Sequence, residues 1–132
     1  MTRYMLDTNT VSHLIRAHQG VTQRVVAAPM ESLCISSITA GELLFGLAKR
    51  PDAKLLHNTV REFLRRVEVL PWEGAIAERY GLLRADMERP GKILAPLDLL
   101  IAAHALNTDT ALVTSDRAFG QVPGLRLEDW TA

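Results

Sequence analysis

Short apolar runs alternate with helix-length segments along the 132 residues of this chain. We predict strands at 3–6, 33–35, 67–70 and 111–114, and a short final strand near 125–127. The segments between them carry apolar residues at helical spacing. Strands that are separated by helices pair in parallel, because a parallel crossover needs about the length of a helix. The sequence therefore predicts an α/β fold with a mostly parallel central sheet flanked by helices.

The intervening segments have recognisable starts and stops. We predict helices at 9–18, 20–27, 38–49, 52–66, 73–88 and 97–107. Asp52 is expected to cap the helix that follows it, and Pro96 suits the first turn of the last helix. Pro90 and Gly91 should stop the helix before them. Since no repeat, low-complexity tract or linker divides the chain, residues 1–132 are expected to form one domain.

The bulk composition is that of a globular protein with a real core. Hydrophobic residues make up 48% of the chain and charged residues 23%, which is not the composition of a disordered segment. The apolar runs end before the ~20 residues that span a bilayer, and the N-terminus lacks the pattern of a secretion signal. The single cysteine, Cys34, lies in an apolar strand and is expected to be a buried structural thiol. We therefore expect a cytoplasmic protein without membrane association.

The charge balance bears on the class of partner. The chain has 15 basic and 15 acidic residues, so its formal net charge is zero, whereas a passive nucleic-acid coat is usually basic. Most of the basic residues are arginines, which make bidentate contacts to phosphate. A neutral, arginine-rich protein can still bind RNA phosphates, although a GC-rich genome accounts for the arginine bias equally well.

Four acids stand at the ends of predicted strands or the starts of predicted helices: Asp7, Glu42, Asp98 and Asp116. Each also has a local explanation. Asp7 can cap the helix after it, and Asp116 can cap a turn. Glu42 can form a capping box with Thr39, and Asp98 can complement the dipole of its helix.

Taken together, the four acids predict one site. The carboxyl ends of parallel strands meet at one edge of a sheet, and carboxylates held there repel one another and titrate together. Oxygen ligands of this kind suit Mg²⁺ and Mn²⁺, and such cations promote phosphodiester hydrolysis. The histidines show no zinc-ligand spacing. His104 in particular is expected to be a core or surface residue outside the site.

Five segments that carry these residues follow one another in a fixed order: Met5–Asn9, Ile35–Thr39 running into Gly41–Leu43, Leu97–Ala105, Leu112–Asp116 and Pro123–Trp130. In that order, and over essentially the full length, they resemble the PIN domain of VapC-type toxins. The resemblance implies a Mg²⁺- or Mn²⁺-dependent endoribonuclease. It also implies that the protein is the toxin of a toxin–antitoxin pair and is held inactive by a VapB-type antitoxin.

The resemblance further implies roles for single residues. The positions that match the family's catalytic acids are Asp7, Glu42, Asp98 and Asp116. Of these, Asp7, Asp98 and Asp116 are the implied metal ligands. Asn9 and Thr114 match the polar residues that support the site. The fourth acidic position varies within the family, so Asp116 is expected to matter least. Structured RNA, either tRNA or ribosomal RNA, is the expected substrate.

We expect two kinds of partner, an antitoxin and a second copy of this chain. An antitoxin should bind through an apolar anchor and an Arg or Lys that enters the acidic site, which would give a toxin–antitoxin hetero-oligomer. A homodimer is expected from the number of apolar residues at 9–18 and 20–27.

Two other functions are compatible with parts of the sequence. A phosphotransfer protein with an aspartyl nucleophile would need a second Asp at the position of Asn9, and a lysine later than Lys92. A receiver domain would need a phosphorylatable Asp after strand 67–70, where Leu-Pro stands instead. A PIN-like RNA-binding module without catalysis remains the non-enzymatic alternative.

Overall fold

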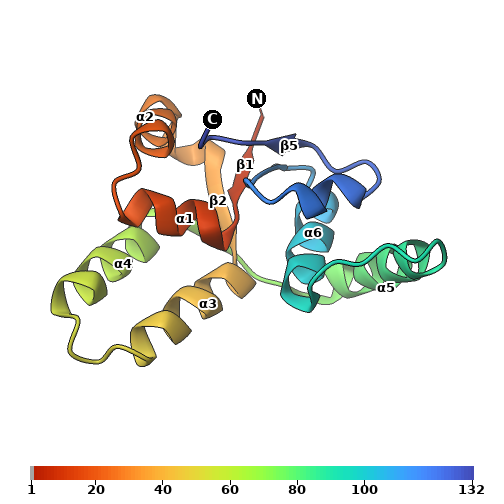
Figure 1. Ribbon diagram of the computed structural model, residues 1–132, viewed down its shortest axis with the longest axis horizontal. Helices are drawn as coiled ribbons and strands as arrows, with labels where there is room; N and C mark the ends of the chain where they lie inside the picture. The colour runs from red at the N-terminus through yellow and green to blue at the C-terminus, as the bar shows by residue number, and fades with distance from the viewer. Residues whose placement is uncertain (1) are drawn as a thin grey trace.

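A five-stranded sheet in the order β3-β2-β1-β4-β5 runs through the computed structural model, which describes residues 2–132 (Figure 1). Every neighbouring pair of strands is parallel. The strands are β1 (Tyr4–Leu6), β2 (Leu33–Ser36), β3 (Glu68–Leu70), β4 (Ala111–Val113) and β5 (Leu127–Glu128). The predicted α/β architecture is confirmed, and each predicted strand is present within two residues of its expected position.

The helices also lie close to their predicted ranges. They are α1 (Thr8–Ile15), α2 (Gln19–Ala27), α3 (Ser37–Ala48), α4 (Lys54–Arg66), α5 (Gly74–Glu88) and α6 (Pro96–Thr108), with the 3-10 turns η1 (Met30–Ser32) and η2 (Arg117–Gln121). Pro96 occupies the first turn of α6 as predicted. Gly91, after α5, has a φ of 80°, which a glycine adopts without strain.

The predicted cap of α4 is wrong. This helix begins at Lys54, and its N-cap is Ala53, which makes no side-chain capping bond. Asp52 lies in the turn before the helix, where the N–H of Ala53 donates to the carbonyl of Arg50. That turn occupies the place that Asp52 would need to cap the first turn of α4.

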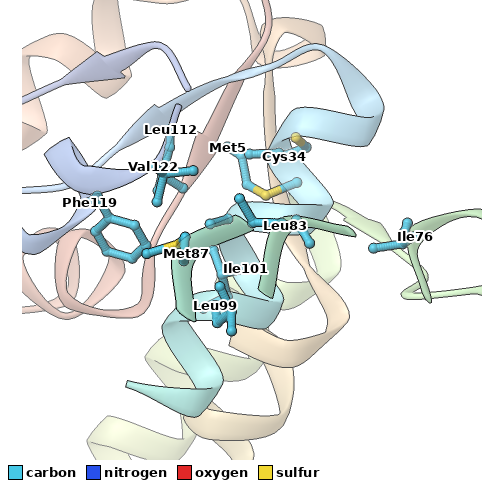
Figure 2. Packing of buried hydrophobic residues seen from close by; sticks show 13 residues of the cluster. Met5, Cys34, Ile76, Leu83, Met87, Leu99, Ile101, Leu112, Phe119 and Val122 are labelled. Atoms are coloured by element: carbon cyan, nitrogen blue, oxygen red, sulfur yellow. The ribbon is translucent and has the colours of Figure 1, made fainter. Parts of the chain in front are cut away.

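Two hydrophobic cores cover the two faces of the sheet. Successive side chains of a strand point to opposite faces, so Met5 and Leu6 of β1 enter different cores. Figure 2 shows Met5 with Leu83, Met87 and other residues of the core beneath α5 and α6. The core of Leu6 is closed by residues from α1, α2, α3 and α4, which lie on the other side of the sheet (Figure 1).

Cys34 is buried in the first of these cores, and burial raises the pKa of its thiol to about 11. The predicted structural role of this thiol is therefore consistent with its position. Within residues 2–132, no helix has both the length and the apolar composition of a membrane span.

The apolar residues of α1 and α2 belong mainly to the core of this one chain. Val11 and Val21 are fully buried, and Leu14, Ile15 and Val25 pack against the same core. Because these contacts are internal, they no longer argue for a homodimer, which stays a prediction.

Candidate active site

The ends of β1 and β4 are joined at the edge of the sheet where the predicted site lies. The two strands are paired neighbours, with Leu6 opposite Val113. The N–H of Asp7 donates to the carbonyl oxygen of Val113 at 3.1 Å, and the hydroxyl of Thr10 donates to the same oxygen at 2.9 Å. The first turn of α1 is thereby fixed to the end of β4.

Asp7 is almost completely buried, with 4% of its surface exposed. It is the N-cap of α1, and its Oδ1 accepts a hydrogen bond from the N–H of Thr10 at 2.8 Å. The local explanation for this acid is therefore confirmed. The cap engages one carboxylate oxygen, which leaves the second oxygen available for a further role.

Glu42 is not part of a capping box. The N-cap of α3 is Ser36, whose Oγ accepts from the N–H of Ile38 at 3.1 Å. Thr39 is inside the helix and buried, so it cannot be the cap that Glu42 would reach back to. Instead, Glu42 Oε1 accepts a hydrogen bond from the hydroxyl of Thr8 at 2.6 Å. This bond places Glu42 beside the start of α1.

Asp98 provides the evidence that the four acids share one region. It is half-buried in the first turn of α6. Its pKa is raised from 3.8 to about 6, first by burial and then by the negative charges of Asp116, Asp7 and Glu42. Charges on four different segments can act on one carboxyl group in this way only if the fold brings them near it. The four acids therefore lie in one region of the fold, and their predicted role as a single metal site stays a prediction.

The remaining predicted residues lie around this region in different ways. Asp116 is exposed and caps η2, where its Oδ1 accepts from the N–H of Ala118 at 2.9 Å. Thr114 is buried, and its hydroxyl accepts from the N–H of Asp116 at 3.0 Å. Asn9 is exposed in the first turn of α1. The functional roles assigned to these three residues stay predictions.

The structure adds two side-chain contacts that the sequence did not indicate. Thr8 is the hydrogen-bond donor to Glu42 described above. His104 and Ser36 form a second link, with 2.7 Å between Nδ1 and Oγ, inside the protein. Burial lowers the pKa of His104, so the ring is neutral near pH 7. This pair connects α6, which carries Asp98, to the start of α3. The position of His104 in the core agrees with the prediction.

The donor set fits a hard divalent cation in chemistry, since four carboxylates offer only oxygen ligands. Within residues 2–132, however, no three Asp, Glu, His or Cys side chains already stand together in a group that could hold an ion. Glu42 and Asp98 are half-buried, and Asp116 is exposed. Asp7 is held in place by its cap.

Comparison with known proteins places the chain in a family. Residues 4–125 match the PIN domain. A curated relative from Salmonella typhimurium, the tRNA(fMet)-specific endonuclease VapC, is 36% identical over 98% of this chain and 99% of its own length. A protein of the same name from Shigella flexneri is 33% identical over 99% of this chain and 100% of its own.

A solved structure agrees with this assignment. The crystal structure of VapBC2 from Rickettsia felis, bound to a DNA fragment from its promoter, contains a chain that is 32% identical to this one. The match has a TM-score of 0.90 and covers 98% of this chain and 99% of that one. The four candidate acids thus lie on a fold that matches VapC-type proteins. The chain belongs to the PIN-domain family and, within it, to the VapC-type proteins.

Proposed function

We propose that this protein is a Mg²⁺- or Mn²⁺-dependent endoribonuclease toxin that hydrolyses a phosphodiester bond in structured RNA. Initiator tRNA is the first candidate substrate, because two close relatives are named tRNA(fMet)-specific endonucleases. The observation that carries the proposal is the match of residues 4–125 to the PIN domain, and the negative charges of Asp116, Asp7 and Glu42 that act on Asp98 support it. Clustered carboxylates are a common solution for binding the cations of phosphoryl chemistry.

In this proposal Asp7, Asp98 and Asp116 would hold the cation. When bound, the cation polarises a phosphate oxygen and lowers the pKa of a water molecule. Glu42 would act on the attacking water. Its Oε1 is held by the hydroxyl of Thr8, which leaves Oε2 free to accept a proton from that water. Asp98 must lose its proton to bind a cation, so activity should fall as the pH drops below about 6.

The test is cleavage of purified tRNA(fMet), beside an elongator tRNA, by the purified protein with Mn²⁺, with Mg²⁺ or with EDTA. Asp7→Asn and Asp98→Asn should lose nearly all activity, and Asp116→Asn should lose less. Asp52→Asn serves as a matched control, because Asp52 is an exposed acid in a turn outside the site. Full activity in excess EDTA, or unchanged cleavage by Asp98→Asn, would contradict the proposed mechanism.

The choice between tRNA and ribosomal RNA needs an experiment in cells. Induced expression of the wild type beside Asp7→Asn, followed by sequencing of new RNA 5′ ends, identifies the RNA that is cut. New ends confined to ribosomal RNA would redirect the proposal to that substrate. If neither RNA acquires new ends while the protein still binds RNA, the non-catalytic module is the better account.

A VapB-type antitoxin is the proposed partner, because the matching Rickettsia structure is a VapBC complex. An Arg or Lys of the antitoxin entering the acidic cluster would replace part of the cation's charge and exclude an RNA phosphate. Co-purification from the native host should recover a small protein encoded nearby that inhibits cleavage. Light scattering of the purified toxin, alone and with that protein, tests the proposed homodimer and hetero-oligomer.

A further inference from the structure

A cleft of about 310 Å³ leads away from the acidic cluster between α1, α3 and α4. Thr8 and Glu42 line one part of it, and these two residues belong to the candidate active site. Arg16, Lys49 and Arg50 also line it, just after the C-terminal ends of α1 and α3. The cleft therefore runs from Glu42, one of the four candidate acids, to a group of basic side chains.

The distance between the two groups follows from helix geometry. Arg16, the C-cap of α1, comes eight positions after Thr8, and Lys49, the C-cap of α3, comes seven positions after Glu42. At about 1.5 Å of rise per residue, the basic group lies roughly 12 Å from the acidic end. That distance allows one extended polymer to contact both groups.

The basic side chains at this end are exposed and lack acidic partners. Among residues 2–132, no carboxylate lies within ion-pair distance of Arg16, Lys49 or Arg50, whereas seven other arginines form ion pairs. Arg16 lies 3.4 Å from Nδ1 of His13, and Lys49 stands over the ring of Phe45 at 4.6 Å. Neither neighbour carries a negative charge, so the three cations can bind an anion without first breaking an ion pair.

The helix dipole explains in part why basic residues stand at this end of the cleft. Arg16 and Lys49 are the C-caps of α1 and α3, where a cation stabilises the helix end. Dipole stabilisation does not neutralise the charge, however, and it does not explain Arg50. It also makes a distinct prediction, since removing such cations should lower stability without changing the binding of RNA.

The wall of the cleft between its two ends is apolar and open. It is formed mainly by Ile15, Leu43, Leu47, Leu56 and Val60. Gly46 also lines it, and a Cβ atom added there would meet nothing within 4 Å. A single RNA strand presents both charged phosphates and the apolar faces of its bases. This cleft offers a matching surface to each.

We propose that the cleft holds the RNA strand on one side of the scissile bond, with Arg16, Lys49 and Arg50 binding backbone phosphates a few nucleotides from the acidic cluster. The inference rests on the proposed ribonuclease function and extends it to the binding of the substrate. Four acids repel RNA, and the chain has no net positive charge to offset them. Local cations beside the site supply the attraction that the molecule as a whole lacks.

The test measures binding of tRNA(fMet) to Asp7→Asn protein, which keeps the RNA intact, as a function of salt concentration. The triple variant Arg16→Gln/Lys49→Gln/Arg50→Gln is made in the same background. Each phosphate contact on a single strand contributes about 0.7 to the slope of log Kd against log salt. The triple variant should therefore lower that slope by about 2 and raise Kd at low salt by about tenfold or more.

A matched control removes the same charge elsewhere. Arg79→Gln/Arg84→Gln/Arg89→Gln changes three arginines on and just after α5, which lies across the sheet from the cleft (Figure 1).

A second variant tests the cleft without altering charge. Gly46→Gln places a side chain in the open part of the cleft, and Gly81→Gln on α5, where an added Cβ also meets nothing within 4 Å, is its control. Only the cleft variants should weaken RNA binding.

The outcomes separate this inference from the proposed function. In the otherwise wild-type enzyme, the triple variant should raise KM for tRNA(fMet) and leave kcat nearly unchanged. If the wild type cleaves RNA but the triple variant keeps the same KM, Kd and salt slope, the assignment of the cleft is wrong. If the triple variant binds RNA as tightly as the unaltered cleft does but binds the antitoxin more weakly, the cleft belongs to the antitoxin and the RNA proposal is wrong. A wild type that cleaves no RNA would instead refute the proposed function.

Discussion

Replacing Asp98 by Asn should make the protein more stable at neutral pH when EDTA is present. The carboxyl group of Asp98 has its pKa raised from 3.8 to about 6 by burial and by the charges of Asp116, Asp7 and Glu42. The charged form is therefore unfavourable in the folded state, and the substitution removes it. The change keeps the size of the side chain, so its packing in the first turn of α6 is largely retained.

The magnitude follows from the shift of the pKa. Each unit corresponds to about 1.4 kcal/mol, so the shift sets an upper limit of roughly 3 kcal/mol. Because Asp98 is only half-buried, solvent screening reduces this to about 1–2 kcal/mol. The substitution also removes a favourable interaction with the helix dipole, worth about 0.3–1 kcal/mol. A net gain of about 1 kcal/mol in the free energy of unfolding is expected from these two terms.

The sign of the pH dependence is fixed by the direction of the shift. A carboxyl group whose folded pKa is raised binds its proton more tightly in the folded state than in the unfolded state. Its ionisation therefore destabilises the fold above about pH 6, and this penalty disappears below the ordinary value of 3.8. The advantage of Asp98→Asn should be complete near neutral pH and shrink as the pH falls through that window.

The assay is denaturant unfolding followed by tryptophan fluorescence. Trp72 reports on α6, because its Nε1 donates to the carbonyl of Leu100 at 3.0 Å, and Trp130 is 3% exposed in the other core. Glu78→Gln on the exposed surface of α5 is the charge-matched control. Mn²⁺ should stabilise the wild type by mass action, by about 2.7 kcal/mol at a hundred times Kd, and Asp98→Asn much less.

One pattern of results would refute this reasoning. If Asp98→Asn is less stable than the wild type in EDTA, and Mn²⁺ does not change the stability of the wild type, the acid acts only on its own helix. The convergence of four carboxylates would then have no energetic consequence.

Three further predictions concern other contacts of the site and the core. Thr8→Val should slow single-turnover cleavage by about tenfold, because Glu42 loses the donor that holds its Oε1 and one such bond is worth about 1–1.5 kcal/mol; Thr8→Ser should restore most of the rate. Ser36→Ala should lower the free energy of unfolding by about 1–3 kcal/mol, since α3 loses its cap and His104 its partner; urea unfolding beside the exposed control Ser115→Ala measures this. Cys34 should resist disulfide reagents in the native protein and react once it is denatured, because burial raises its pKa to about 11 and only the thiolate reacts.

Each of these has a clear contrary outcome. Thr8→Val cleaving as fast as the wild type would mean that the hydrogen bond to Glu42 has no catalytic part. Ser36→Ala as stable as Ser115→Ala would remove the structural importance of the link between α6 and α3. Rapid labelling of native Cys34 would show that the first core opens readily.

Much of the fold could be predicted from local patterns alone. Burial leaves a period of about 3.6 residues in helices and of two in strands, so alternating short runs and longer amphipathic segments indicate parallel β-α units. Asp7 and Asp98 were recognisable as candidates because each stands where a strand ends or a helix begins. Both inferences depend only on neighbours within a few positions in the chain.

The tertiary structure decided what depends on residues far apart in the sequence. The sequence does not specify the strand order β3-β2-β1-β4-β5, which packing selects among the possible parallel orders. Glu42 fits a capping box locally, yet the N-cap of α3 is Ser36, earlier in the chain, and Glu42 bonds to Thr8 instead. Ser36 also pairs with His104, 68 positions away. Hydrogen bonds and unpaired charges of this kind leave no periodic pattern in the sequence, because they form only when packed helices bring distant side chains together.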